Sequence, residues 1–167
     1  MGQGREIRCY DYVNHPYERV RAALAGDAAA VFTAATRAAS SRAETVAAQL
    51  RVNVAGLEVA KDIAIAVRGI QEDPRGADGA PVTRLQLEWE AAESPRLFPF
   101  MRAELSIYPL TATETQLDFA GRYEPPLGAL GSAMNALAGH RIAEASVHRF
   151  LQDVASHLRT ELGKPGA

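Results

Sequence analysis

The sequence contains a single cysteine, Cys9, in 167 residues. One thiol cannot form an intramolecular disulfide, and it cannot supply the paired cysteines of a zinc ribbon or of a CxxC redox motif. The sequence therefore excludes a disulfide-stabilised fold. A reducing compartment fits this composition, so we expect a cytoplasmic protein.

Neither sign of charge dominates, and long apolar runs are missing. The chain has 18 Lys and Arg residues against 20 Asp and Glu residues, with no block of like charge. This balance predicts no basic surface for a phosphate backbone, so nucleic acid is not an expected partner. Residues 1–8 are not apolar, and no run of about 18 apolar residues occurs, so neither a signal peptide nor a membrane span is expected.

Recognisable catalytic and metal-binding motifs are also missing. There is no GxSxG motif, and Cys9 has no evident base beside it, so nucleophilic catalysis is not indicated. His140, Glu144 and His148 follow at four-residue steps on one side of a helix, but they lack the HExxH pattern and a fourth ligand. A solvated helix face explains them better, and we expect neither a metal nor another cofactor.

The longest helical pattern runs from Leu127 to Leu162, behind Pro125 and Pro126. The two prolines lack the backbone donors that a strand needs, and they allow a helix to start after them. Apolar residues at spacings of three, four and seven then predict one helix roughly 50 Å long. The stripe on this helix consists of Leu127, Leu130, Met134, Leu137, Arg141, His148, Leu151, Leu158 and Leu162.

Six segments alternate apolar and polar side chains, which predicts strands with one solvated face. They are 5–13, 46–54, 63–67, 84–91, 101–107 and 116–123. Segment 73–81 is polar and rich in Gly and Pro, so it is predicted to be a hairpin loop.

Two short helices are predicted after the first strand. Pro16 suits the first turn of a helix that runs to about Ala25, and Gly26 is expected to end it. Asp27 can then cap a second helix, from about Ala28 to Ala38.

This order predicts one α+β domain, residues 1–167, with a helix-grip architecture. A curved antiparallel sheet of six or seven strands wraps around the long C-terminal helix, and the two short helices follow the first strand. An antiparallel sheet that is solvated on one face must cover the other, and the terminal helix is long enough to do so. Because the sheet twists, it separates from the helix at one end, which leaves a cavity.

The layout resembles the START-related superfamily, also called SRPBCC or helix-grip proteins. The residues that carry this resemblance are NHPYERVRAAL after the first strand, and GRYEPPLGALG with HRIAEASVHRFLQDVASHL at the end. The polyketide cyclase/dehydrase and lipid-transport proteins are the most similar named group, and the birch-pollen allergen is a more distant relative. The resemblance implies a hydrophobic cavity that binds a lipid, sterol, polyketide or other apolar molecule. It does not imply one chemistry, because the fold hosts transporters, receptors and enzymes.

Several large side chains are expected in the interior, either as plain core or as ligand contacts. The polar tips of two of them, the Trp89 indole and the Tyr123 hydroxyl, need partners when buried and can orient a ligand. The full set is Trp89, Phe98, Phe100, Met101, Phe119, Tyr123 and Met134.

Arg141 and His148 interrupt the apolar stripe of the terminal helix, seven residues apart. If the stripe faces the cavity, Arg141 could hold a carboxylate or enolate and His148 could move a proton. In the alternative, the inner face is rotated toward Ile142, Ala145 and Phe150, and both polar residues lie at the rim.

Asp11 is a third polar candidate, because it lies on the apolar side of the first strand. A buried carboxylate is costly without a partner, so Asp11 either pairs, with Arg141 as one option, or lies at an exposed sheet edge.

Three functions fit these patterns. The first is binding, sequestration or transport of a small hydrophobic ligand. The second is a polyketide cyclase, aromatase or dehydratase, with Arg141, His148 and Asp11 in acid–base or anchoring roles. The third is an interaction module or homodimer with a filled core.

Overall fold

The structure is a computed structural model that describes residues 5–49, 63–91, 101–123 and 136–165. These residues form five strands and two helices. In chain order they are β1 (Arg5–Val13), α1 (Tyr17–Gln49), β2 (Ile63–Asp73), β3 (Val82–Ala91), β4 (Met101–Pro109), β5 (Thr115–Tyr123) and α2 (Ala136–Leu162).

The five strands form one antiparallel sheet in the order β1-β5-β4-β3-β2. Strands β2 to β5 follow one another as a meander, and β1 joins the far edge by pairing with β5. The alternation of buried and exposed residues along β4 and β5 confirms the predicted one-sided strands. The expected number of six or seven strands is wrong for the described residues, which contain five.

The predicted hairpin loop between β2 and β3 is confirmed. The Gly76 amide donates to the Ala80 carbonyl at 2.8 Å, which closes the loop. Gly79 has a φ of 77°, a left-handed conformation that only glycine adopts without strain.

Helix α1 corrects the prediction of two short helices. The Pro16 carbonyl accepts hydrogen bonds from the amides of Arg19 at 3.0 Å and Val20 at 3.2 Å, so the helix starts where the sequence predicts. It then continues through Gly26 and Asp27 without a break. A glycine inside a helix costs only about 1 kcal/mol relative to alanine, which burial of neighbouring apolar side chains outweighs.

The expected strand from Val46 to Val54 is wrong up to Gln49, where the chain is still helical. Its later part lies outside the described residues. Alternating Val and Ala gives a weak strand signal, because alanine is also the strongest helix former. Ala35 and Ala39 are fully buried, so the small side chains of α1 allow close packing along α2.

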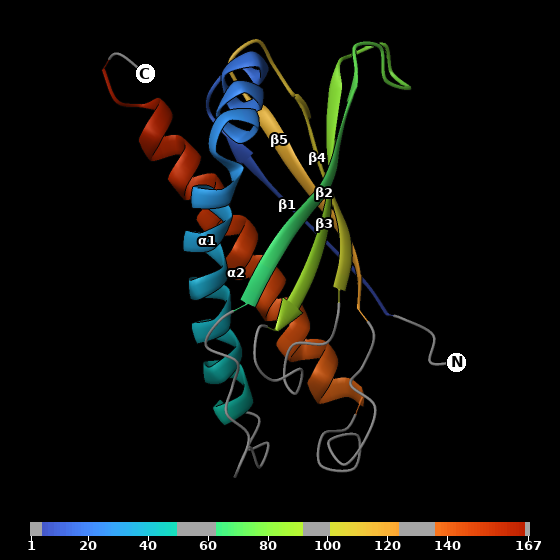
Figure 1. The fold of residues 1–167 in the computed structure, drawn as a ribbon, viewed down its shortest axis with the longest axis vertical. Helices are drawn as coiled ribbons and strands as arrows, with labels where there is room; N and C mark the ends of the chain where they lie inside the picture. Colours follow the sequence, from blue (N-terminus) through green and yellow to red (C-terminus); the bar gives the residue numbers. More distant parts are fainter. Residues whose placement is uncertain (1–4, 50–62, 92–100, 124–135, 166–167) are drawn as a thin grey trace.

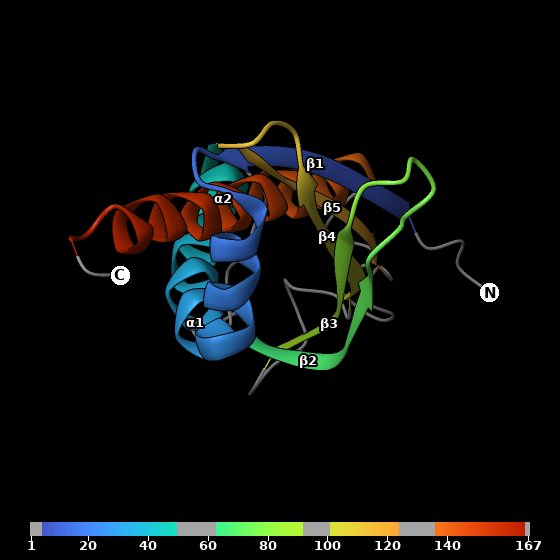
Figure 2. The ribbon, with the colours of Figure 1, turned by 90° about the horizontal axis from the view of Figure 1, so that it is seen from above.

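The sheet curves, and the two helices close its open side (Figure 2). Helix α2 packs on the β1 edge, and α1 packs on α2 and on the β2 edge. Figure 1 shows both helices running along the same side of the sheet. The apolar core lies between them, so the helix-grip arrangement agrees with the fold that the resemblance implies. The prediction that α2 covers the sheet is incomplete, because α1 packs on α2 and on the β2 edge as well.

Helices α1 and α2 both carry charged residues along their length. No helix in the described residues combines the length and the apolar character that crossing a membrane needs.

Candidate functional site

Four aromatic rings meet in the interior, from both helices and two strands. Phe150 of α2 lies at the centre, with its ring centroid 4.8 Å from that of Trp89 on β3. Phe32 on α1 lies 5.7 Å from Phe150, and Phe119 on β5 lies 6.1 Å from it. The rings are tilted or edge-on, as aromatic pairs prefer. All four side chains are buried, so the cluster forms a rigid apolar wall.

Beside this cluster, three predicted site residues form a row across the sheet. Trp89 is paired with Met101, and Met101 is paired with Tyr123, so their side chains share the inner face. The row lies where β3 and β5 end and β4 begins, at the end of the sheet nearest the start of α2 (Figure 1). There the Tyr123 ring stacks on His140 of α2, with centroids 6.1 Å apart. Sheet and helix therefore meet through aromatic contact.

Two buried polar atoms at this end have no hydrogen-bond partner among the described residues. They are Nε1 of Trp89 and Nδ1 of His140. Leaving a buried polar group unpaired costs about 1–3 kcal/mol, and most such groups in proteins do have partners. Burial raises the pKa of the neighbouring Tyr123 hydroxyl, with Arg5 acting in the opposite direction. This end of the core therefore combines apolar walls with unsatisfied polar atoms.

The other predicted ligand contacts divide into two groups. Phe119 is in the aromatic cluster and fully buried. Phe98, Phe100 and Met134 lie outside the described residues. A role in ligand contact stays a prediction for all of them.

Arg141 and His148 lie on the solvent side of α2, so the rotated orientation is the one in the structure. Ile142 and Phe150 point inward and are buried, as that alternative predicted, and Ala145 is half-buried. At about 3.6 residues per turn, Leu151 is displaced about 80° around the helix from Arg141. The sequence stripe therefore joined two different faces of α2.

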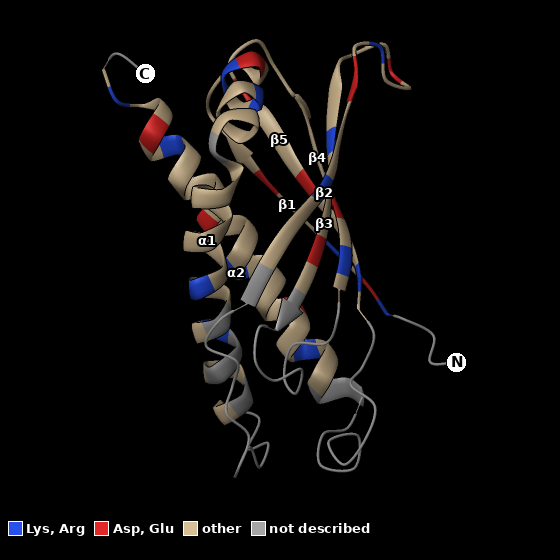
Figure 3. Ribbon diagram, viewed as in Figure 1, with Lys and Arg blue, Asp and Glu red and all other residues tan. Residues whose placement is uncertain are grey.

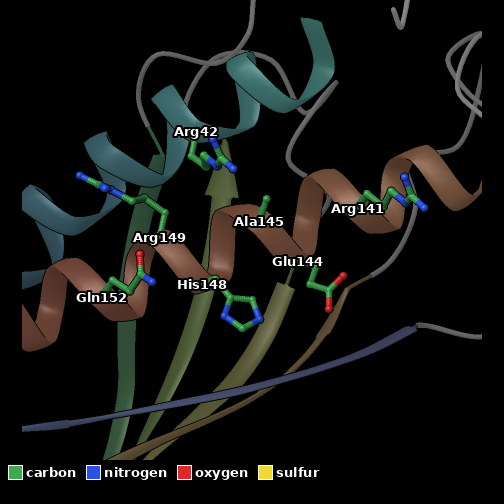
Figure 4. A pocket seen from close by; sticks show the side chains of 7 residues that line it. All are labelled: Arg42, Arg141, Glu144, Ala145, His148, Arg149 and Gln152. Atoms are coloured by element: carbon green, nitrogen blue, oxygen red, sulfur yellow. The ribbon is translucent and has the colours of Figure 1, made fainter. Parts of the chain in front are cut away.

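Arg141 and His148 instead line an outward groove with Glu144, Ala145, Arg149 and Gln152 of α2 and Arg42 of α1 (Figure 4). In Figure 4 Arg42 reaches down from α1 toward Ala145, while Glu144 and His148 point to the side on which β1 runs. Among these lining residues, Arg149 alone has an ion pair within the described segments, with Asp153 at 3.3 Å.

Asp11 pairs with Arg159 and not with Arg141. Arg159 Nη2 donates to Asp11 Oδ1 at 2.8 Å and also to the Tyr12 carbonyl. The Tyr12 amide donates to the same Asp11 oxygen at 2.7 Å. The structure therefore brings Arg141 and His148 together on the surface and separates Asp11 from them.

Sequence reasoning missed the partners of these residues. Arg159 is the basic residue in the last turn of α2, and nothing in the sequence links it to Asp11. Arg42 lies in a segment that was expected to join a helix to a strand. Phe150 was not missed, because the rotated alternative placed it inward. Ile142, Phe150 and Val154 recur at helical spacing, and all three are buried. Within the described segments, no three His, Cys, Asp or Glu side chains are placed to hold a metal ion.

No family model matches the chain, and no curated protein matches it. Solved structures do match. The Zhui aromatase/cyclase from Streptomyces sp. R1128 is 15% identical with a TM-score of 0.47, over 95% of both chains. A START superfamily protein from Mycobacterium smegmatis is 10% identical with a TM-score of 0.48, over 95% of this chain and 99% of that one. Ara h 8.0201 is 6% identical with a TM-score of 0.42, over 93% of this chain and 98% of that one. Similarity at this level carries no information about the ligand or activity of this chain.

Proposed function

We propose that the protein binds a small hydrophobic molecule between the sheet and α2, at the end where Trp89, Tyr123 and His140 lie. One observation carries this proposal: Trp89 Nε1 is buried inside an otherwise apolar cluster and has no hydrogen-bond partner in the part of the chain that the structure describes. An indole N–H can only donate a hydrogen bond, so the missing partner is an acceptor atom. A bound molecule with a carbonyl or hydroxyl oxygen would supply it.

The side chains around Trp89 indicate that most of the bound molecule is apolar. Met101, Phe119 and Phe150 surround Trp89 with thioether and aromatic groups, which match hydrophobic ligands in shape and polarity. The His140 Nδ1 atom adds a second polar position at the rim of the same cluster. A mostly apolar ligand that carries one or two oxygen atoms therefore fits these residues best.

Binding is favoured over cyclase chemistry because the acid–base candidates do not converge. Asp11 accepts a 2.8 Å hydrogen bond from Arg159, so its carboxylate already has a partner. Arg141 and His148 are exposed on the opposite side of α2 from the aromatic cluster. A substrate in the interior would contact none of the three.

Two experiments test the proposal. Native mass spectrometry of protein purified without detergent is expected to show a bound hydrophobic molecule. In solution, 2-acetylnaphthalene is expected to displace bound Nile red at lower concentrations than 2-ethylnaphthalene does. The two compounds have the same shape, but 2-ethylnaphthalene lacks the carbonyl. The preference is expected to be roughly tenfold, the value of one hydrogen bond to a buried donor.

The variant Trp89→Phe isolates the hydrogen bond, because it keeps an aromatic ring and removes the N–H group. It is expected to retain 2-ethylnaphthalene binding and to lose the preference for 2-acetylnaphthalene. Tyr10→Phe is the matched control, since Tyr10 is 74% exposed on the opposite face of the sheet. Absence of copurified molecules together with no displacement by either compound would overturn the proposal.

A further inference from the structure

The groove on the solvent side of α2 is separate from the aromatic interior. It has a volume of about 530 Å³ and is lined by Arg42, Arg141, Glu144, Ala145, His148, Arg149 and Gln152. Helix α2 supplies six of these residues, and Arg42 extends over them from α1 (Figure 4). Ala145 points toward Arg42, and its small side chain leaves space between the two helices. The groove is therefore formed by helix packing and does not depend on a loop.

Positive charge in this groove is incompletely neutralised. Arg42 and Arg141 make no ion pair with any residue in the described part of the chain. Three arginines on the outer face of the sheet differ, because Arg68, Arg84 and Arg102 each lie within 4.0 Å of a carboxylate oxygen. Figure 3 shows this mixture of acidic and basic positions along the strands. In the described part of the chain, the groove thus brings together two guanidinium groups that have no carboxylate partner.

We propose that this groove binds the phosphate group of a small organic phosphate. A guanidinium group offers paired N–H donors in a planar fork, which matches phosphate oxygens. Arg42 of α1 and Arg141 of α2 both line the groove, so guanidinium donors from two helices are available to a phosphate group bound there. His148 and Gln152 add N–H donors at the same surface.

Glu144 defines the remainder of the ligand. A carboxylate repels a bare anion, but it accepts hydrogen bonds from hydroxyl or amino groups. In Figure 4 Glu144 points to the side of α2 away from Arg42, so the acceptor and the arginine from α1 lie at opposite sides of the groove. A phosphate ester whose organic part carries hydroxyl groups would use both sides. This inference is independent of the hydrophobic-ligand proposal, because the groove and the aromatic cluster lie on opposite faces of α2.

Binding is tested by NMR titration of the ¹⁵N-labelled protein with glycerol 3-phosphate, with glycerol and potassium chloride as neutral and ionic-strength controls. Saturable shifts are expected at residues of α1 and α2 around Arg42 and Ala145, with the phosphate ester only. Phosphatidic acid vesicles form a second arm, with phosphatidylcholine vesicles as control. Binding to these vesicles without binding of the soluble ester would identify the phosphate source as a lipid headgroup.

The double variant Arg42→Gln and Arg141→Gln is expected to weaken binding by at least about tenfold, because it removes both charge-assisted donors. Glu144→Gln is expected to strengthen binding of inorganic phosphate about two- to fivefold, since it removes a like charge. Arg75→Gln, in the exposed hairpin between β2 and β3, is the matched control and is expected to bind as the parent does. Equal binding by the double variant and by Arg75→Gln, or shifts that also appear with potassium chloride, would overturn the proposal.

Discussion

Arg159 in the last turn of α2 donates a hydrogen bond to Asp11 on β1, with 2.8 Å between Nη2 and Oδ1. The same guanidinium bonds the Tyr12 carbonyl, and its Cζ atom lies 5.4 Å from the centre of the Tyr12 ring. Three interactions thus fasten the C-terminal part of α2 to the edge strand β1. The side chains are partly shielded, with 35% of Arg159 and 19% of Asp11 exposed.

Arg159→Ala is expected to lower the free energy of unfolding by about 1–3 kcal/mol, because Asp11 keeps a shielded carboxylate without its partner. Asp11→Asn is expected to cost less, since the amide oxygen still accepts a hydrogen bond from Arg159. Urea unfolding of both single variants and the double variant measures their coupling. Additive effects would show that the two side chains do not stabilise each other.

Gly121→Ala is expected to destabilise the fold by about 1–3 kcal/mol through overpacking. A Cβ atom at this position would lie 2.7 Å from Phe119 Cε1 and 3.0 Å from Met101 Sδ. Gly26→Ala is the control, because a Cβ atom there has no atom within 4 Å. Because Gly26 lies inside α1, the Gly26→Ala substitution is expected to stabilise the protein by roughly 0.5–1 kcal/mol. Thermal unfolding of the pair should therefore shift in opposite directions.

Cys9 is expected to react slowly with thiol reagents in the folded protein. Burial raises the pKa of its thiol to about 12, with smaller contributions from Asp118, Asp11 and Glu144. The thiol form therefore dominates throughout the usual pH range, and alkylation by iodoacetamide at pH 8 should require unfolding. Rapid modification of the native protein at this pH would contradict the buried position.

The same shift links stability to pH. Because the pKa is raised in the folded state, the contribution of Cys9 is fully present below its ordinary value of 9.0 and is lost as the pH rises toward about 12. Unfolding measured between pH 8 and 11 should therefore show a steeper loss of stability for the parent than for Cys9→Ala. Parallel curves would refute this linkage.

Tyr17→Phe is expected to reduce stability by about 1–2 kcal/mol. Its hydroxyl lies 2.6 Å from Thr83 Oγ1, and both residues are buried where α1 begins next to β3. The variant leaves Thr83 with one hydrogen-bond partner fewer. Thr83→Val removes the other half of the pair, so the double variant should cost less than the sum of both. Strict additivity, measured by denaturant unfolding, would argue against a shared hydrogen bond.

Strands β1, β3, β4 and β5 could be predicted because each has one solvated face. The predicted buried face of β2 is wrong in part, because Val67 is 37% exposed, and Ile70 farther along the strand is 47% exposed. Trp89 and Phe119 alternate with polar neighbours, and both proved to be buried. Helix α1 was divided wrongly, since Gly26 carries a local stop signal while the continuity of the helix depends on its packing against α2. Local propensity contains no information about such tertiary contacts.

The candidate site was predicted only in part, for a related reason. Its sheet side, Trp89 with Met101 and Tyr123, follows from strand periodicity. The orientation of α2 does not, because a stripe read at spacings of three, four and seven drifts around the helix. The sequence left two orientations open, and Arg141 lies on the surface, as the rotated one predicted. Pairs such as Asp11 and Arg159, 148 residues apart, depend on the completed topology.

The position of β1 has a consequence for the order of folding. Its partner β5 comes late in the chain: Thr115 Oγ1 donates to the His15 carbonyl, 100 residues away in sequence, and Arg159 reaches back to Asp11 from still farther. During synthesis, strand β1 is therefore expected to remain unpaired until its partner β5 has been made. The meander of β2 to β5 can assemble earlier from near neighbours, and closure by the two chain ends is expected to be the slow step.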